Sequence, residues 1–329
     1  MLKYDEPMSK EDLYYFSNLD LDDKIKLSKD IIVEFYESCD LNDGHIYISS
    51  SFGKDSIVLI SLVRSIYPNV PIVYINTGVE QPSTYAISKE YENVFELTPK
   101  KSMEQVIEEY GYILPIGKDK SGCIEYARKN IYEGNFNTNR VKKLRGDYGK
   151  GLYDWRKLQP LLLAPFKISD RCCYWLKEQP LNSFTSKNKF KYQINGITAE
   201  ESLVRKTSLL KKGFINKKEC RPLGHWKVHD ILEYILKYNL PLASCYGNIV
   251  EDENGFYVTT GFYRTGCTCC PVGSHRDKPN QFQLLYEIDI EIWDYVINDL
   301  GFKQVLDYFD VPYYPDQQEE HKNLDSFLE

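Results

Sequence analysis

The stretch SSSFGKDSIVLISLVRSI, Ser49–Ile66, contains the residues that decide how the fold is interpreted. The residues just before it, HIYISSS from His45, are β-branched and aromatic, as is typical of a strand. Apolar residues then follow at helical spacing, at Leu59, Leu62 and Val63. The segment SFGKDS is therefore predicted to be the turn between a strand and a helix.

This turn is suited to bind an anion, because the first amides of a helix lack partners inside the helix and the helix dipole is positive there. Gly53 lets the backbone approach a phosphate closely, and Lys54 adds a mobile positive charge. A Walker A loop would need a glycine and a serine or threonine where this chain has Ile48 and Asp55. The pattern predicts a phosphate-binding loop of another kind; the alternative is a polar surface turn.

The composition is that of an ordinary globular protein, with 42% hydrophobic and 27% charged residues among 329. This length suffices for one large domain with an appendage, or for two domains. A net charge of −7 disfavours a nucleic-acid footprint over the whole surface but is compatible with a local basic patch.

The N-terminal residues MLKYDEPMSKEDLYYF lack the apolar core of a signal peptide. No apolar run approaches the roughly 18 residues that a membrane span needs. We therefore expect a soluble, cytoplasmic protein without a membrane partner. In that compartment the nine cysteines are expected to be ligands or reactive thiols rather than disulfides.

Strand-like and helical segments alternate along the chain. Residues 9–38 are predicted to be helical, and PIVYIN from Pro71, VFELT from Val94 and YQINGI from Tyr192 are predicted strands. The alternation favours an α/β fold, a Rossmann-like parallel sheet with right-handed crossovers and helices on both faces. Ligands of such sheets bind beyond the carboxyl ends of the strands, which makes SFGKDS and the following NTGVE turn candidates to flank one nucleotide.

Three parts are expected: an N-terminal helical segment over residues 1–40, a nucleotide-binding α/β domain over 41–275 and a C-terminal helical extension over 276–329. Residues 117–170 form a less regular excursion, rich in Lys, Arg, Gly and Asn. We interpret it as a solvated segment. The alternative is a basic lip over residues 128–150 for a polyanionic or nucleic-acid acceptor.

The cysteines form two groups that are far apart in the sequence. Cys172 and Cys173 are adjacent, and Cys267 and Cys270 form a C-x-x-C. Soft thiolates suit zinc or an iron–sulfur cluster, but structural zinc normally uses two C-x-x-C knuckles. Cys269 is open to three roles: a spare thiol, an alternative ligand or a redox residue. The remaining four are expected to be buried apolar residues: Cys39, Cys123, Cys220 and Cys245.

Five blocks together resemble one family. They are SFGKDS, RCCYWLKEQPL, GITAEESLVR, RPLGHWKVHDILEYILKYNLPL and RTGCTCCPVG, and they span about residues 45–275. In this order they are similar to the pyrophosphate loop, the Cys-Cys block, a strand end, a helix and the second cysteine pair of the phosphoadenosine phosphosulfate reductase (sulfonucleotide reductase) family. That family lies within the adenine nucleotide α-hydrolase-like superfamily.

The resemblance implies a [4Fe–4S] cluster on Cys172, Cys173, Cys267 and Cys270. It places Lys177 near that cluster and the substrate phosphates, so that Lys54 and Lys177 become the candidate catalytic residues. The nucleotide-binding residues that it implies are Ser51, Gly53, Lys54, Asp55, Ser56, Thr77, Gly78, Glu201 and Arg205.

Two departures from the reductases bear on function. Assimilatory reductases end in a mobile Glu-Cys-Gly-x-His segment, whereas this chain has no cysteine after Cys270. Those reductases also tend to lose the loop lysine, whereas Lys54 and Asp55 are intact here, as in relatives that split ATP at the α-phosphate. In NTGVE, Asn76 stands where many relatives have Asp.

The leading hypothesis is therefore an enzyme that splits ATP to AMP and pyrophosphate, with Mg²⁺, in a sulfur-transfer or adenylation reaction. One alternative is a sulfonucleotide reductase, acting on adenosine phosphosulfate or its 3′-phosphorylated form, whose missing thiol comes from Cys269 or from a thiol or sulfur-donor partner protein. Another is a non-catalytic, nucleotide-regulated module that binds a nucleic acid or a partner. The sequence leaves the acceptor, and a structural, sulfur-carrying or redox role of the cluster, open.

Overall fold

The protein divides into two compact units in a computed structural model that describes residues 4–151, 154–274 and 278–317. The first unit comprises Met1–Asn76, Glu80–Thr98 and Pro180–Gly266. The second comprises Thr77–Val79, Pro99–Gln179 and Cys267–Glu329. Each unit is thus built from separate stretches of the chain. The division at residues 40 and 275 stays a prediction.

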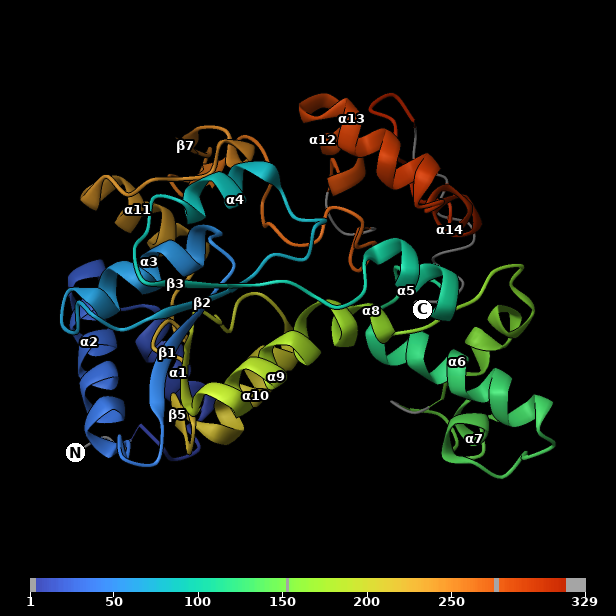
Figure 1. The fold of residues 1–329 in the computed structure, drawn as a ribbon, viewed down its shortest axis with the longest axis horizontal. Coiled ribbons are helices and arrows are strands. Elements are labelled where there is room, and N and C mark those ends of the chain that lie inside the picture. The colour runs from blue at the N-terminus through green and yellow to red at the C-terminus, as the bar shows by residue number, and fades with distance from the viewer. Residues whose placement is uncertain (1–3, 152–153, 275–277, 318–329) are drawn as a thin grey trace. The chain divides into compact units, whose positions relative to one another are not determined.

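The first unit contains a six-stranded sheet, a small hairpin and the helices that pack on them (Figure 1). Its elements are α1 (Lys10–Ser17), α2 (Leu21–Ser38), β1 (His45–Ser50), α3 (Lys54–Arg64), β2 (Ile72–Ile75), α4 (Pro82–Ser88), β3 (Val94–Leu97), α9 (Gln179–Asn188), β4 (Phe190–Asn195), α10 (Leu203–Lys212), β5 (Ile215–Asn216), β6 (Glu219–Cys220), α11 (Val228–Tyr238), the 3₁₀ turn η3 (Ser244–Tyr246), β7 (Ile249–Glu251) and β8 (Tyr257–Thr259).

The large sheet has the order β3-β2-β1-β4-β6-β5, in which all neighbours are parallel except the antiparallel pair β5 and β6. The predicted parallel sheet is confirmed. Strand β1 is central, with Ile48 opposite Ile72 of β2 on one side and Ile194 of β4 on the other. After β1 the chain adds β2 and β3 on one side of it. After β4, which pairs with the other side of β1, the chain adds β5 and β6 in the opposite direction. The boundary between β1 and β4 is therefore the switch point at which such folds bind ligands.

Helices lie on both faces of this sheet, with α2 and α3 on one side and α9 and α10 on the other (Figure 1). The apolar face of α3 is buried, as its spacing predicts, at Leu59, Leu62 and Val63. Helix α11 buries Ile231 and Ile235 in the same way and ends where Asn239 adopts the left-handed conformation. Amphipathic spacing thus indicates the packed side of α11, whereas α3 is buried nearly all round, at Val58 and Ile60 as well.

The N-terminal helices are held to the first unit by buried polar contacts. Lys24 of α2 pairs with Asp230 of α11 at 2.5 Å, and both side chains are almost fully buried. Ser28, one turn further along α2, accepts a hydrogen bond from Trp226 Nε1 at 2.9 Å. Because a buried charge without its partner is strongly destabilising, these contacts fix the place of α2.

The second unit is helical in its described residues. Its elements are α5 (Met103–Tyr110), α6 (Lys118–Tyr132), α7 (Asn139–Arg145), the 3₁₀ segment η1 (Arg156–Leu163), α8 (Arg171–Cys173), the π turn η2 (Tyr174–Glu178), α12 (Gln281–Ile288), α13 (Ile290–Asp294), the π turn η4 (Tyr295–Asp299) and α14 (Lys303–Tyr308). No helix in the described part of the chain is long and apolar enough to cross a bilayer.

Residues 117–170 are more ordered than the sequence predicts. Helices α6 and α7 and segment η1 bury apolar residues of their own, among them Ile124, Leu144 and Leu161. Arg128 donates to three backbone oxygens at the end of this segment, including Phe166 O at 2.7 Å and Leu161 O at 2.6 Å. The first cation of the predicted basic lip therefore has a structural role. The expected irregular structure is wrong, whereas most of residues 132–140 and 145–150 are exposed to solvent, as expected.

Candidate nucleotide and cysteine sites

The SFGKDS loop is folded by its own serine hydroxyls. Ser50 Oγ accepts a hydrogen bond from Phe52 N at 2.9 Å, and Ser56 Oγ accepts one from Ser51 N at 3.3 Å. Phe52 adopts a positive φ of 54°, which is uncommon for a residue other than glycine. Its buried ring packs against Tyr74 at 5.2 Å, and this contact holds the strained turn in place. The backbone of the loop is thus held by side chains of the loop itself and by Tyr74.

Lys54 begins α3, as the sequence predicts, and its side chain is only 3% exposed. Its Nζ lies 2.9 Å from Asp55 Oδ2 and 5.5 Å from the centre of the Tyr263 ring. Burial lowers the pKa of Lys54, but the charge and hydrogen bond of Asp55, with nearby tyrosines, outweigh it and leave the pKa above its ordinary value. The loop therefore carries a fixed positive charge at neutral pH.

Two hydroxyl groups from a distant segment lie on this loop. Tyr246 Oη accepts a hydrogen bond from Lys54 N at 3.0 Å and lies 2.9 Å from Thr265 Oγ1. A Cβ added at Gly53 would lie 2.7 Å from Thr265 Oγ1 and 2.9 Å from Tyr246 Oη. Glycine at this position thus makes room for two protein hydroxyls. Sequence reasoning missed both residues: Thr265 lies in a quoted block without a role, and Tyr246 lies in no motif.

The chain that follows β4 lies beside the loop, at the switch point. A Cβ added at Gly196 would approach Asp55 O to 3.3 Å, so the two loops are in close contact. Glu201 and Arg205 form an ion pair one turn apart. Burial lowers the pKa of Arg205; the negative charge of Asp55 opposes this shift and the positive charge of Arg264 adds to it. The predicted loop residues therefore lie near Arg205 and its partner Glu201; these loop residues are Ser51, Gly53, Lys54, Asp55 and Ser56.

Thr77 and Gly78, the other predicted nucleotide contacts, belong to the second unit. Thr77 is buried, and Gly78 has a φ of 78° with open space where a Cβ would be. The neighbouring Val79 O accepts hydrogen bonds from Thr268 N at 2.7 Å and from Thr268 Oγ1 at 3.0 Å. The NTGVE turn is thus tied to the second cysteine block.

All four predicted cluster ligands also belong to the second unit. Cys172 and Cys173 lie in α8, directly before the π turn that carries Lys177. Single π turns of this kind are frequent at functional sites. A hydrogen bond from Cys172 lowers the pKa of Cys173 to about 6, and the positive charges of Lys118 and Lys177 act in the same direction.

The C-x-x-C block is a tight turn, in which Cys270 N donates to Cys267 O at 3.0 Å. Gln281 of α12 supports this turn by donating from Nε2 to Cys270 O at 2.5 Å. Cys269 lies between the two proposed ligands in the sequence. Its side chain is fully buried, and this burial raises its pKa strongly. Cys269 is therefore directed into the protein.

The thiols of the two segments fall within electrostatic range of one another. A hydrogen bond with Cys173 and burial raise the pKa of Cys172, and Cys270 adds a smaller electrostatic contribution. Burial together with Cys267 and Cys173 raises the pKa of Cys270 to about 12. Mutual repulsion among buried thiolates is what a bound metal cluster would relieve, so the donor set fits one in kind. Among the described residues, however, no three His, Cys, Asp or Glu side chains are grouped closely enough to hold a metal ion. The predicted cluster is not confirmed.

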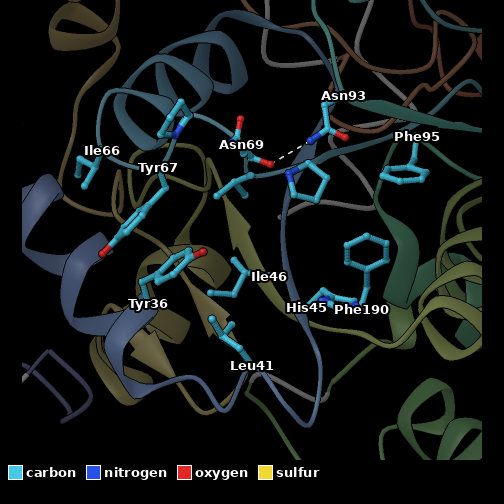
Figure 2. A pocket seen from close by; sticks show the side chains of 13 residues that line it. Tyr36, Leu41, His45, Ile46, Ile66, Tyr67, Asn69, Asn93, Phe95 and Phe190 are labelled. Carbon is cyan, nitrogen blue, oxygen red and sulfur yellow. Dashed lines mark hydrogen bonds between the residues drawn. The ribbon is translucent and has the colours of Figure 1, made fainter.

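Figure 2 shows a hollow of about 490 Å³ in the first unit. Its lining includes the stacked rings of Tyr36 and Tyr67, 3.8 Å apart, together with His45 and Phe190. His45 and Phe190 begin β1 and β4, so this hollow lies at the amino ends of the strands. Nucleotides bind at the opposite edge of such sheets, and the hollow is therefore distinct from the loop site.

Comparisons with known proteins agree with this arrangement. The family model of the phosphoadenosine phosphosulfate reductase domain matches residues 45–120 and 125–273. The chain is 23% identical over 307 residues to the uncharacterized protein MJ0973 of Methanocaldococcus jannaschii, covering 92% of this chain but only 60% of that protein. It is 26% identical over 230 residues to the adenosine 5′-phosphosulfate reductase of Lysinibacillus sphaericus, covering 69% of this chain and 73% of that enzyme.

Among solved structures, the phosphoadenylyl-sulfate reductase of Candida auris in its phosphate complex covers 76% of this chain and 98% of its own, at 12% identity and a TM-score of 0.40. The family model matches most of the chain, and its matched range contains the SFGKDS loop, the switch point and both cysteine segments. The chain belongs to the phosphoadenosine phosphosulfate reductase domain family, within the adenine nucleotide α-hydrolase-like superfamily.

Proposed function

We propose that this protein is an enzyme that binds ATP at the SFGKDS loop and splits it to AMP and pyrophosphate in a sulfur-transfer or adenylation reaction. The observation that carries the proposal is Lys54, whose charge is held beside Asp55 at the first turn of α3. ATP carries β- and γ-phosphates for this cation to contact. The phosphosulfate of a sulfonucleotide offers no such pair.

The residues of the loop have defined tasks in this reaction. An acceptor oxygen attacks the α-phosphorus, the bond from that phosphorus to the bridging oxygen breaks, and pyrophosphate leaves with the electron pair. Backbone amides at the start of α3 and the Lys54 ammonium stabilise the charge that grows on the leaving group. Ser51 and Ser56 add hydroxyl donors, and Glu201 and Arg205 complete the nucleotide contacts of the first unit. A Mg²⁺ ion on the phosphates would add further positive charge.

Cys172, Cys173, Cys267 and Cys270 would hold the [4Fe–4S] cluster of this enzyme. When bound, such a cluster supplies a site for sulfur or for electrons. Lys177 adds positive charge next to the thiolates, since it stabilises the charged forms of Cys173 and Cys270. Sulfur from a thiol or sulfur-donor protein then attacks the carbon of the adenylated acceptor, the carbon–oxygen bond breaks, and the oxygen leaves as part of AMP.

Binding and turnover of the Lys54→Ala variant test this function. Removing one charge-assisted contact should weaken the free energy of ATP binding by about 1.5–3 kcal/mol. The rate of pyrophosphate release should fall by at least the factor that corresponds to this energy. Lys89→Ala, which removes an exposed lysine of the same unit, is the control and should bind ATP normally. Calorimetry measures binding without an acceptor, so wild-type protein that does not bind ATP contradicts the proposal.

A second candidate function is sulfonucleotide reduction, which the named activity of the Lysinibacillus relative favours. The buried thiol of Cys269 is poorly placed to replace the missing terminal cysteine. A reductase would therefore depend on an external thiol. Sulfite released from adenosine 5′-phosphosulfate in the presence of a thiol, with no ATP binding, would favour this candidate.

A further inference from the structure

The hydroxyl groups of Tyr246 and Thr265 lie where the phosphates of a bound nucleotide are expected. Tyr246 Oη accepts a hydrogen bond from Lys54 N, an amide at the start of α3, as a phosphate oxygen would. The ring of Tyr246 is 1% exposed, which shows that it is a fixed part of the site. A mobile cap would be more exposed.

Proton counting shows that this pair has a hydrogen-bond donor to spare. Each hydroxyl carries one proton, and the 2.9 Å contact between Tyr246 and Thr265 uses only one of the two. Tyr246 receives its other bond from Lys54 N and needs no proton for it. Among the described residues, no further acceptor contacts either hydroxyl. One O–H is therefore available beside the loop.

Other donors meet at the same place. Among the described residues, the amides of Gly53, Asp55 and Ser56 make no hydrogen bond to the protein. The site also holds the cation of Lys54, and Arg205 and Arg264 are close enough to repel each other. Unused backbone amides and nearby cations, which are the groups that hold phosphate oxygens, are suited to a polyphosphate chain.

We propose that Tyr246 and Thr265 are phosphate-binding residues of this site. Tyr246 fixes the first amide of α3, and the pair turns its spare proton to an oxygen of the β,γ-pyrophosphate group. This inference rests on the proposed function, because it assigns the two hydroxyls to the same nucleotide. It adds a neutral pair of donors from the segment before the C-x-x-C block to the charged contacts of the loop.

Calorimetry with ATP, inorganic pyrophosphate and AMP tests the pair. Tyr246→Phe and Thr265→Val should each weaken ATP and pyrophosphate binding on the order of 10- to 100-fold, since each removes either the hydroxyl that donates to the phosphate or the partner hydroxyl that orients it. Thr265→Ser keeps the hydroxyl and should bind nearly as wild type. AMP lacks the β- and γ-phosphates, and its affinity should change less than twofold. Tyr238→Phe, on the exposed end of α11, is the matched control and should have no effect.

Several outcomes overturn the assignment. If Tyr246→Phe binds ATP as tightly as wild type or more tightly, the hydroxyl is a cap that the phosphates displace. If the variants weaken AMP and ATP binding equally, the pair only supports the fold. The same follows if Thr265→Ser weakens ATP binding as much as Thr265→Val does. Thermal unfolding of each variant checks this. Loss of binding in Lys54→Ala but not in Tyr246→Phe overturns this inference alone. Wild-type protein that binds neither ATP nor pyrophosphate overturns the proposed function as well.

Discussion

The loop site of the first unit and the cysteine site of the second differ in how many protein contacts hold their residues in place. At the loop, serine hydroxyls, the Phe52 ring and the Tyr246 hydroxyl hold the backbone in place. At the cysteines, the thiols come within electrostatic range, but within the described part of the chain they form no group that could hold a metal. Neutral hydrogen bonds can fix a site in advance. Buried thiols with raised pKa values, such as Cys172 and Cys270, become ligands only when a metal stabilises their charged forms.

The largest expected effect concerns the cysteine site. Anaerobically purified protein should be brown and contain about four iron and four sulfide per chain, as a Cys₄-ligated cubane requires. Serine in place of Cys172, Cys173, Cys267 or Cys270 should abolish the colour and the iron. Metal analysis and absorbance measure both.

Two cysteine variants serve as controls for this result. Cys39→Ser should keep its iron, because Cys39 lies in the first unit. Cys269→Ser should also keep it, because that side chain is buried between the proposed ligands. Stoichiometric zinc in a fully folded protein would contradict the cluster. Iron lost in Cys269→Ser but kept in Cys270→Ser would show that the C-x-x-C register is wrong.

The scaffold of the loop site gives the next largest effect. Asp230→Ala leaves Lys24 buried without its partner and should destabilise the first unit by about 3–5 kcal/mol. The matched control is Asp22→Ala, which breaks the exposed pair with Lys237 and should cost less than about 1 kcal/mol. Denaturant unfolding measures both variants. Equal losses would show that the buried pair does not support the loop site.

A pH dependence should also be specific to the first unit. Burial and the charge of Lys24 lower the pKa of His225 to about 3. Because the unfolded chain binds this proton at a higher pH than the folded chain, stability is lost as pH falls from 6.5 toward 3. The loss is about 1.4 kcal/mol per pH unit.

The variant His225→Phe isolates this contribution. It removes the proton-binding group while keeping an aromatic ring beside Phe214 and Trp226. Between pH 7 and pH 5 it should lose about 2 kcal/mol less stability than wild type. Unfolding curves at the two pH values provide the measurement, and parallel losses in both proteins would rule out His225 as the cause.

The smallest effect is expected at the basic segment of the second unit. The test reverses four cations of α7: Arg140, Lys142, Lys143 and Arg145. Two of them stack on rings, Arg140 on Tyr126 at 4.1 Å and Lys143 on Trp155 at 4.5 Å, which reduces the charge free to face a ligand. Polyanion binding should weaken, with a shallower dependence on salt. If the variant binds the polyanion as wild type does at every salt concentration, these cations do not line a path for the acceptor.

Much of the first unit could be predicted because its signals are local. The β-branched run to Ser50, the glycine at position 53 and the spacing of Leu59 and Leu62 specify a strand, a turn and a helix within twenty residues. Helices α6 and α7 were missed because their apolar residues are few and are interrupted by Gly and Asn. Their order comes from packing around Ile124 and Leu144, which no local pattern shows.

The sequence by itself determined the loop, the parallel sheet and the two cysteine segments, because each is encoded in spacing along a short stretch of chain. Only the tertiary structure placed Gly196 and Arg205 beside Asp55, because that contact depends on β4 pairing with β1. It alone brought Tyr246 onto the amide of Lys54, 192 residues away. A contact between residues so far apart in the sequence has no local pattern that could predict it, because it forms only when the chain folds.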